Sequence, residues 1–455
     1  MTPLARFAMV VLVSMLIGAG LGASYIKRME SPPAPVTVTP KPPSAPVTVY
    51  TPVDANDLPG WTQDSVAQGL PALKRSCAQF ATLDPATVIG RDTIARSALA
   101  WQTACRALNE VNDGDAALRA VLARDFTAYR VAQSKAAPSD GTAPEPPNDR
   151  GTFTGYYEAD LKGSLTRGGA FQVPIYGRPR NLVTVNLKDF LPPSTQLPAG
   201  VPPSLVGRVG ESGALKPYYT RAEIDADGAI ADDADVLLWA DDPVAVHILH
   251  IQGSGRVTLP DGQIVRIGFA GHNGRAFRGI GSILLEAGAV KPGGASMVAV
   301  REWLAQHPTE AADYMNRNTR YIFFRKLDAA EAQDGPIGAQ GVSLTPLRSM
   351  AVDPQFIPLG APVWLDTVDP DGIPLQRLMV AQDVGAAITG AVRGDIFWGH
   401  GDDAFTKAGR MKSAGGYFVF VPQLNGPQIN GASAPNPQNR GSQNQDPQTP
   451  NETAK

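Results

Sequence analysis

Three aspartates lie in short Gly-rich motifs between Ser349 and Pro422: Ala351-Val-Asp-Pro-Gln-Phe-Ile-Pro-Leu-Gly360, Ala381-Gln-Asp-Val-Gly-Ala-Ala-Ile388 and Gly394-Asp-Ile-Phe-Trp-Gly399. Asp353, Asp383 and Asp395 each follow or interrupt an apolar run, so we expect each where a β-strand gives way to a turn. The apolar run after Asp395 should partly exclude water from its carboxyl, which can raise the pKa toward the ~6 of a general acid. The motifs indicate acid/base chemistry, although aspartates at strand ends most often only cap a turn.

The overall composition favours a mainly β protein that does not bind nucleic acid. The chain has 455 residues, with 40 Lys and Arg against 43 Asp and Glu. Because no basic stripe is present, we do not expect the chain to bind nucleic acids or acidic lipids. Gly (46) and Pro (41) are frequent and separate many short β-branched runs, which is typical of short strands.

The N-terminal region predicts export. Residues 1–28 form a membrane anchor or signal segment, because Phe7–Ile26 is apolar and long enough to span a bilayer. Lys27 and Arg28 directly after this stretch favour an anchor that is not cleaved. Residues 29–57 are rich in proline and are expected to form an extended tether. No cysteine precedes Cys77, so lipid anchoring is not supported.

Helical spacing of apolar residues from Trp61 to Arg130 predicts a small helical region. In an oxidising compartment, Cys77 and Cys105 within it are interpreted most simply as one disulfide between two helices. Strands dominate from Gly151 onward, except for a helix expected at 295–307 and stopped by Pro308. The tail at 423–455 is rich in Asn, Gln, Pro and Gly and is expected to be disordered.

Further motifs upstream of the three aspartates strengthen a resemblance to a known family. They are Gly155-Tyr-Tyr-Glu158, Pro174-Ile-Tyr176, Tyr219-Thr-Arg-Ala-Glu-Ile-Asp225, Ile251-Gln-Gly-Ser-Gly-Arg256, Gly271-His-Asn-Gly274 and Gly279-Ile-Gly281. With Ser349–Pro422, they resemble the membrane-bound lytic transglycosylase A family, which ends in a three-aspartate (3D) domain. The resemblance covers roughly Gly151 to Pro422.

The resemblance implies a fold in which a double-psi β-barrel receives an inserted smaller β-barrel domain, with glycan lying in the groove between them. Mapped onto this chain, residues 58–164 would hold the helical region and the first part of the barrel. Residues 165–291 would form the insert, and residues 292–422 the rest of the barrel. The family commonly has Asp-Thr-Gly-Gly-Ala-Ile where this chain has Asp383-Val-Gly-Ala-Ala-Ile388, and the spacing to Asp395 is one residue longer than expected.

Several side chains are predicted to bind sugar. Val244–Gln252 is interpreted as a strand, in which His247 and His250 would point to opposite faces and could not share a metal. His250 and Gln252 would share a face, and with Ser254 in the following turn they could line a sugar groove.

Tyr157 and Trp398 flank matched motifs and could stack on pyranose rings, while Asn273 and Arg278 offer hydrogen-bond donors. The aspartates at 225, 227, 232, 233 and 235 lack the spacing of a calcium loop and are interpreted as a solvated loop.

The resemblance implies an exo-acting peptidoglycan lytic transglycosylase that needs no metal and no cofactor. Such an enzyme cleaves the β-1,4 bond from N-acetylmuramic acid to N-acetylglucosamine and forms a 1,6-anhydro product. Asp395 matches the single acid/base residue, Asp383 would orient it, and Asp353 would fix the fold. The residues themselves do not separate exo from endo cleavage. The protein would be a monomer on the periplasmic side of a membrane.

Two alternatives remain open from the sequence. A lysozyme-like hydrolase needs two carboxyl groups, and Asp383 would supply the second. A non-catalytic peptidoglycan-binding or septal protein would keep only the scaffold.

Overall fold

The computed structural model describes residues 47–423, apart from residues 113, 135–144, 193–194, 196, 198–200, 203 and 329–334. The predicted membrane segment, most of the predicted tether and nearly all of the predicted tail lie outside these residues. Within the described part of the chain, no helix is long and apolar enough to cross a bilayer.

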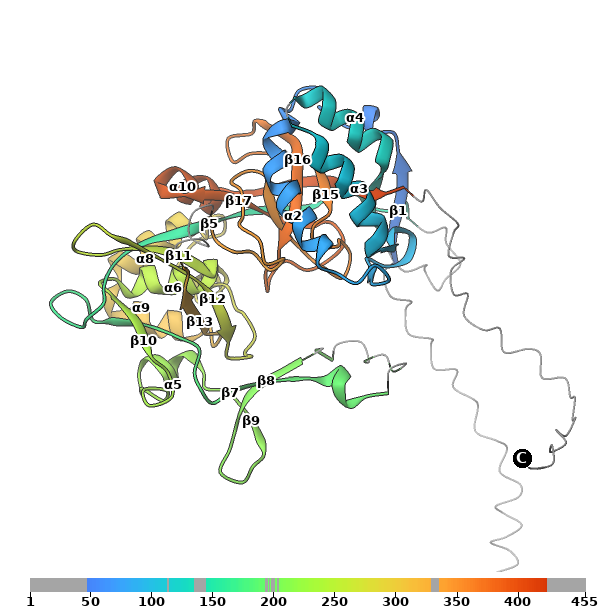
Figure 1. The fold of residues 1–455 in the computed structure, drawn as a ribbon. Helices are drawn as coiled ribbons and strands as arrows, with labels where there is room; N and C mark the ends of the chain where they lie inside the picture. Colours follow the sequence, from blue (N-terminus) through green and yellow to red (C-terminus); the bar gives the residue numbers. More distant parts are fainter. Residues whose placement is uncertain are drawn as a thin grey trace, which may run out of the picture. The chain divides into compact units, whose positions relative to one another are not determined.

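Six strands pair into a closed ring. In ring order they are β18 (Lys412–Pro422), β15 (Pro362–Val368), β16 (Pro374–Asp383), β14 (Ser349–Val352), β17 (Arg393–His400) and β5 (Gly151–Ser164). The ring closes because β18 is long enough to pair with β15 through residues 416–419 and with β5 through residues 412–415. Figure 1 shows β5 running beside β17, with which it pairs in parallel.

Part of the predicted tether belongs to the folded protein. Strand β1 (Val47–Val53) pairs with β4 (Phe126–Ser134), and β4 pairs with β18 at the side of the ring. Tyr50 is buried there and donates a hydrogen bond to the Phe356 carbonyl at 2.8 Å. The tether prediction is therefore wrong for residues 47–57, because the β-branched residues of Val47–Val53 outweigh Pro52, which an edge strand tolerates.

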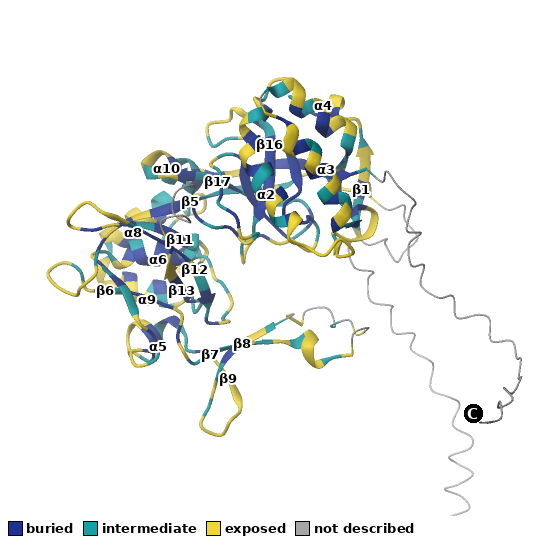
Figure 2. Ribbon diagram, in the orientation of Figure 1, coloured by how far each residue is buried: buried dark blue, intermediate teal, exposed yellow. Residues whose placement is uncertain are grey.

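Three helices cover the ring: α2 (Leu70–Ala81), α3 (Ala98–Glu110) and α4 (Asp115–Asp125). Their apolar faces join the ring strands in one hydrophobic core, and Figure 2 shows their outer faces exposed. A disulfide joins Cys77 of α2 to Cys105 of α3, as the sequence predicts. Arg348 and Asp64 form a buried two-point ion pair at 2.7 and 2.8 Å that ties the segment before α2 to the ring.

The second half of β5 enters another ladder. It pairs with β11 (Ser254–Thr258), which continues through β12 (Ile264–His272) to β13 (Ile322–Lys326). On its other side, β5 pairs with β10 (Val236–Ala240), and β10 pairs with β6 (Val173–Tyr176). An isolated bridge from Gly177 to Phe324 connects the two ends of this ladder.

The second ladder encloses its own hydrophobic core, which reaches beyond the predicted insert. Helices α8 (Met297–Gln306) and α9 (Pro308–Asn316) contribute to this core, as does β13. The boundary predicted at residue 291 therefore falls too early, because these elements pack with the insert and not with the first ring. The remaining elements in this half are β7 (Leu182–Asn186), β8 (Ser204–Val209), β9 (Leu215–Pro217), α5 (Arg221–Asp225) and α7 (Ile280–Glu286).

The predicted strand at Val244–Gln252 is wrong, since residues Pro243–Gln252 form helix α6. The Asp242 side chain caps its first turn, Pro243 occupies the first helical position, and Gly253 ends it in the left-handed conformation at φ 81°. Because α6 is buried nearly all round, its sequence lacks the polar stripe that would reveal a helix.

The helix predicted at 295–307 is present as α8, and Pro308 starts the next helix directly. Helix α10 (Gly401–Arg410) was not predicted.

Replacing both Cys77 and Cys105 by serine should lower the free energy of unfolding by about 3–4 kcal/mol, because the bridge closes a loop of 28 residues in the unfolded chain. Urea denaturation of the purified variant, compared with the oxidised parent, measures the difference. An unchanged free energy of unfolding would show that the bridge does not restrain the helical region.

Candidate active site

Four neighbouring strands bring two of the three aspartates together. Ala351 of β14 is the register partner of Asp383 on β16 and of Asp395 on β17. On the far side of β17, Asp395 is in register with Thr154 of β5. Asp383 is the last residue of its strand, as predicted, whereas Asp395 lies inside β17 and not at a turn.

The carboxyl of Asp395 is mostly surrounded by protein. It accepts a hydrogen bond from the Thr154 hydroxyl at 2.5 Å, and that hydroxyl accepts one from Arg393 Nη2 at 2.8 Å. Burial raises the pKa of Asp395 to about 6, against the lowering effects of Thr154 and Arg393 and with a smaller upward contribution from Asp383. A carboxyl with this pKa can both donate and accept a proton near neutral pH.

Asp383 is held by three donors. The backbone N–H groups of Ala339 and Val384 both donate to its Oδ1 at 2.9 Å, and the Tyr156 hydroxyl donates to Oδ2 at 2.9 Å. Burial raises the pKa of Asp383, while these hydrogen bonds oppose the rise. The pKa of Tyr156 is raised well above its ordinary value by burial and by the neighbouring carboxylate, so its hydroxyl remains a donor.

Asp353 follows β14 and makes local contacts. Its carboxylate accepts hydrogen bonds from the N–H groups of Gln355 at 3.0 Å and Gly390 at 2.8 Å. These bonds connect the turn after β14 to the loop that leads into β17. The longer spacing between Asp383 and Asp395 falls in this loop, and Asp395 still meets Thr154.

Tyr157 and Trp398, the predicted stacking residues, lie on the other face of the sheet from Asp395. A Cβ at Gly155 would lie 2.5 Å from Trp398 Nε1, so Trp398 packs over Gly155, between Thr154 and Tyr156 in the strand. Alternation along β5 places Thr154 and Tyr156 on the opposite face. Tyr157 is buried in the second core against Phe405, with ring centroids 5.4 Å apart. The structure therefore does not bring these two rings together with the aspartates.

Asn273 and Gln252, both predicted to bind sugar, form hydrogen bonds within the protein through their side-chain amides. Asn273 is completely buried, and its amide group donates to the Tyr219 and Thr319 carbonyls, both at 2.8 Å, and accepts from the Tyr321 N–H at 2.9 Å. It is therefore a structural residue, and its prediction as a free donor is wrong. Gln252 Oε1 accepts the Tyr157 N–H at 3.0 Å and fastens α6 to β5.

Ser254 and Arg278 are placed differently. Ser254 begins β11 and is buried, whereas the exposed guanidinium of Arg278 pairs with Glu286. Among the described residues, neither the Ser254 side chain nor the Arg278 side chain forms a hydrogen bond or an ion pair with Asp383 or Asp395.

Helix α6 overturns the prediction that His247 and His250 point to opposite faces and that His250 lines a sugar groove with Gln252. His247 and His250 are three residues apart on a helix, so they share a side, and both are buried. Burial lowers the pKa of both well below the ordinary value. The His250 ring packs against Tyr321, with centroids 4.3 Å apart. Among the described residues, no three His, Cys, Asp or Glu side chains are grouped to hold a metal ion.

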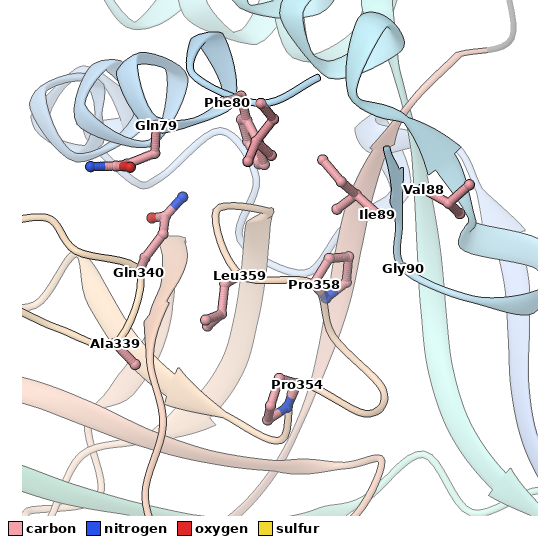
Figure 3. A pocket seen from close by; sticks show the side chains of 11 residues that line it. Gln79, Phe80, Val88, Ile89, Gly90, Ala339, Gln340, Pro354, Pro358 and Leu359 are labelled. Atoms are coloured by element: carbon pink, nitrogen blue, oxygen red, sulfur yellow. The ribbon is translucent and has the colours of Figure 1, made fainter. Parts of the chain in front are cut away.

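A pocket of about 420 Å³ lies next to the segment around Ala339 and Gln340, which binds Asp383 through a backbone N–H group. Figure 3 shows its lining, which comes from α2, from the short strand β2 (Val88–Ile89), and from segments around Gln340 and Pro354. Ala339, whose N–H binds Asp383, lies on its wall, but the described lining does not include the two aspartates themselves.

Thr154, the backbone of Ala339 and the hydrogen-bonding role of Tyr156 were not predicted from the sequence. Thr154 and Tyr156 alternate with Gly155 and Tyr157, so the strand pattern already places them on one face. The sequence contains no signal for which side chains of β5 lie on the same side of the sheet as Asp395. That depends on a parallel pairing between residues 241 positions apart.

Asp395→Asn should stabilise the protein at pH 8 by roughly 2 kcal/mol and have little effect near pH 4. The folded pKa of about 6 exceeds the ordinary 3.8, so the folded state binds more protons between these values. The contribution of the carboxyl to stability is therefore complete below pH 4 and is lost as the pH rises through 6. Urea denaturation at both pH values measures this, with the exposed Asp227→Asn as control. Equal effects at pH 4 and pH 8 would contradict the raised pKa.

Comparisons with known proteins identify the family of the chain. Residues 152–325 match the model of the MltA specific insert domain, and residues 348–421 match that of the 3D domain. The chain is 32% identical over 276 residues to membrane-bound lytic murein transglycosylase A of Escherichia coli, an alignment covering 59% of this chain and 65% of that relative, just under two thirds of its length.

Solved structures are similar over more of their length. The crystal structure of MltA from Neisseria gonorrhoeae is 32% identical with a TM-score of 0.65, and the similarity covers 84% of this chain and 96% of that one. The membrane-bound lytic murein transglycosylase from Agrobacterium tumefaciens is 30% identical with a TM-score of 0.68, covering 82% and 97%. The chain therefore belongs to the MltA family of membrane-bound lytic murein transglycosylases.

Proposed function

We propose that this protein is a lytic transglycosylase that cleaves peptidoglycan glycan strands with Asp395 as its single general acid and base. The observation that carries the proposal is the environment of Asp395. Its carboxyl is withdrawn from water, is hydrogen-bonded by Thr154, and has its pKa raised to about 6 by burial. Membership of the MltA family supplies the substrate class.

In the proposed reaction, protonated Asp395 donates its proton to the oxygen of the β-1,4 bond between N-acetylmuramic acid and N-acetylglucosamine. The bond from C1 to that oxygen breaks, and positive charge develops on the muramic ring. The ring's own 6-hydroxyl then attacks C1 while the Asp395 carboxylate takes the hydroxyl proton. The acid is regenerated, no water is consumed, and the product is 1,6-anhydromuramic acid. An internal nucleophile reacts at high effective molarity, which makes this route favourable.

Asp383 is proposed to orient the site. With three donors on its carboxyl group, it is fixed in place, and its negative charge favours the protonated form of Asp395. Asp353 is proposed to hold the loop before β17 through Gly390.

Further parts of the proposal concern fold and location. The six-stranded ring is consistent with a double-psi β-barrel, and the ladder built on β5 with a smaller inserted barrel. We also propose a monomer on the periplasmic side of a membrane, attached through residues 1–28. Ser254 and Arg278 remain proposed substrate contacts.

A hydrolase is the second candidate, because Asp383 and Asp395 flank the same residue of β14. In that case Asp383 would activate a water molecule, and the product would keep a reducing end.

Digestion of purified sacculi followed by mass analysis separates these functions. The lytic reaction yields muropeptides lacking one water and having no reducing end, whereas hydrolysis adds water. Asp395→Asn should reduce turnover by about 10³-fold while leaving glycan binding intact, because only proton transfer is lost. The exposed Asp227→Asn serves as a matched control. Water-added products alone, or full activity of the Asp395 variant, would refute the proposal, and absence of turnover in the parent would favour a binding protein.

A further inference from the structure

The residue before Asp383 is bound to the N-terminal helical region. The Gln382 side chain is fully buried, and its Nε2 donates to the Ala72 carbonyl at 2.9 Å and to Ser76 Oγ at 2.8 Å, both on α2. Its Oε1 accepts a hydrogen bond from Ser349 Oγ at 2.6 Å. All three hydrogen bonds are buried. Breaking one of them would leave a buried polar group without a partner, which destabilises the folded protein.

The segment that binds Asp383 is attached to the same group. The Ser76 hydroxyl donates to Gln340 Oε1 at 2.7 Å, and the Gln340 N–H donates to the Gln382 carbonyl at 3.0 Å. Ala339, the neighbour of Gln340, donates its N–H to Asp383. Figure 3 shows Ala339 and Gln340 on one segment, with the Gln340 side chain directed toward α2 near Gln79.

Close packing leaves this segment little freedom. A Cβ at Gly338 would lie 2.5 Å from the Gln382 carbonyl oxygen, so the backbone here lies directly against β16. Gln340 attaches the segment to β16 through its backbone N–H and to α2 through its side chain, directly beside the Ala339 N–H that binds Asp383.

We propose that Ser76, Gln340 and Gln382 are positioning residues, through which helix α2 holds the Ala339 N–H against Asp383 and so fixes that carboxylate beside Tyr156 and Asp395. This inference rests on the proposed function for its effect on turnover. It makes the helical region part of the catalytic apparatus, and the Cys77–Cys105 disulfide secures α2 at the residue next to Ser76.

The consequence for the acid follows from electrostatics. The Asp383 charge raises the pKa of Asp395, and so does the exclusion of water. If the Ala339 segment moves away, Asp383 loses a donor and water gains access, so the pKa of Asp395 falls. Because the general acid must be protonated, activity then declines at lower pH than in the parent.

The test compares Gln340→Ala and Ser76→Ala with the parent protein. Gln340 is only partly buried, so its variant is expected to fold even if Ser76→Ala does not. We expect kcat on soluble glycan strands to fall about tenfold with KM little changed, and the alkaline limb of the kcat/KM profile to move to lower pH. Gln102→Ala is the matched control, since Gln102 bonds only the Phe80 and Leu83 carbonyls at the end of α2.

A lowered melting temperature with kcat and the pH profile unchanged would show a merely structural role and overturn the proposal. The pH dependence of the unfolding free energy provides a readout that needs no turnover, because the loss of stability between pH 4 and pH 8 should shift to lower pH in Gln340→Ala. If the parent forms no anhydro product, the proposed function fails, and this second readout still decides the positioning role.

Discussion

The parallel pairing of β5 with β17 is the constraint on which the rest of the structure depends. It places the Thr154 hydroxyl against the Asp395 carboxyl and, two residues later, the Tyr156 hydroxyl within reach of Asp383. The same strand continues into the second ladder, where Glu158 forms a buried ion pair with Arg266. A single strand therefore supplies one hydroxyl donor to each of the two carboxyl groups and joins the two β structures.

Keeping a carboxyl away from water costs stability, and the surrounding architecture offsets that cost. Asp395 is held by a hydroxyl and not by a direct ion pair, so its charged form receives only modest stabilisation. The buried Arg348–Asp64 pair is compensated more fully, because the two charges bind each other and also the backbone groups of Leu378. The paired charges are held in one ionisation state, while the weakly compensated acid remains able to exchange a proton.

The aspartate motifs, the disulfide and the mainly β class could be predicted from the sequence because each depends on local residue types. The helix α6 could not, since its run of apolar residues fits a buried helix and a buried strand equally well. Tyr157 was predicted to stack on sugar because it flanks matched motifs, whereas only long-range pairing decides that the Tyr156 side chain faces the acids. Asn273 resembled a free donor, but tertiary contacts with Tyr219 and Tyr321 use its amide completely.

Burial raises the pKa of Asp395 to about 6, and this is tested most directly by following its carboxyl carbon during an NMR titration. Labelled protein, with the signal assigned by comparison with the Asn variant, should show a single transition for Asp395 near pH 6. A transition near pH 4, where an ordinary aspartate titrates, would contradict the account.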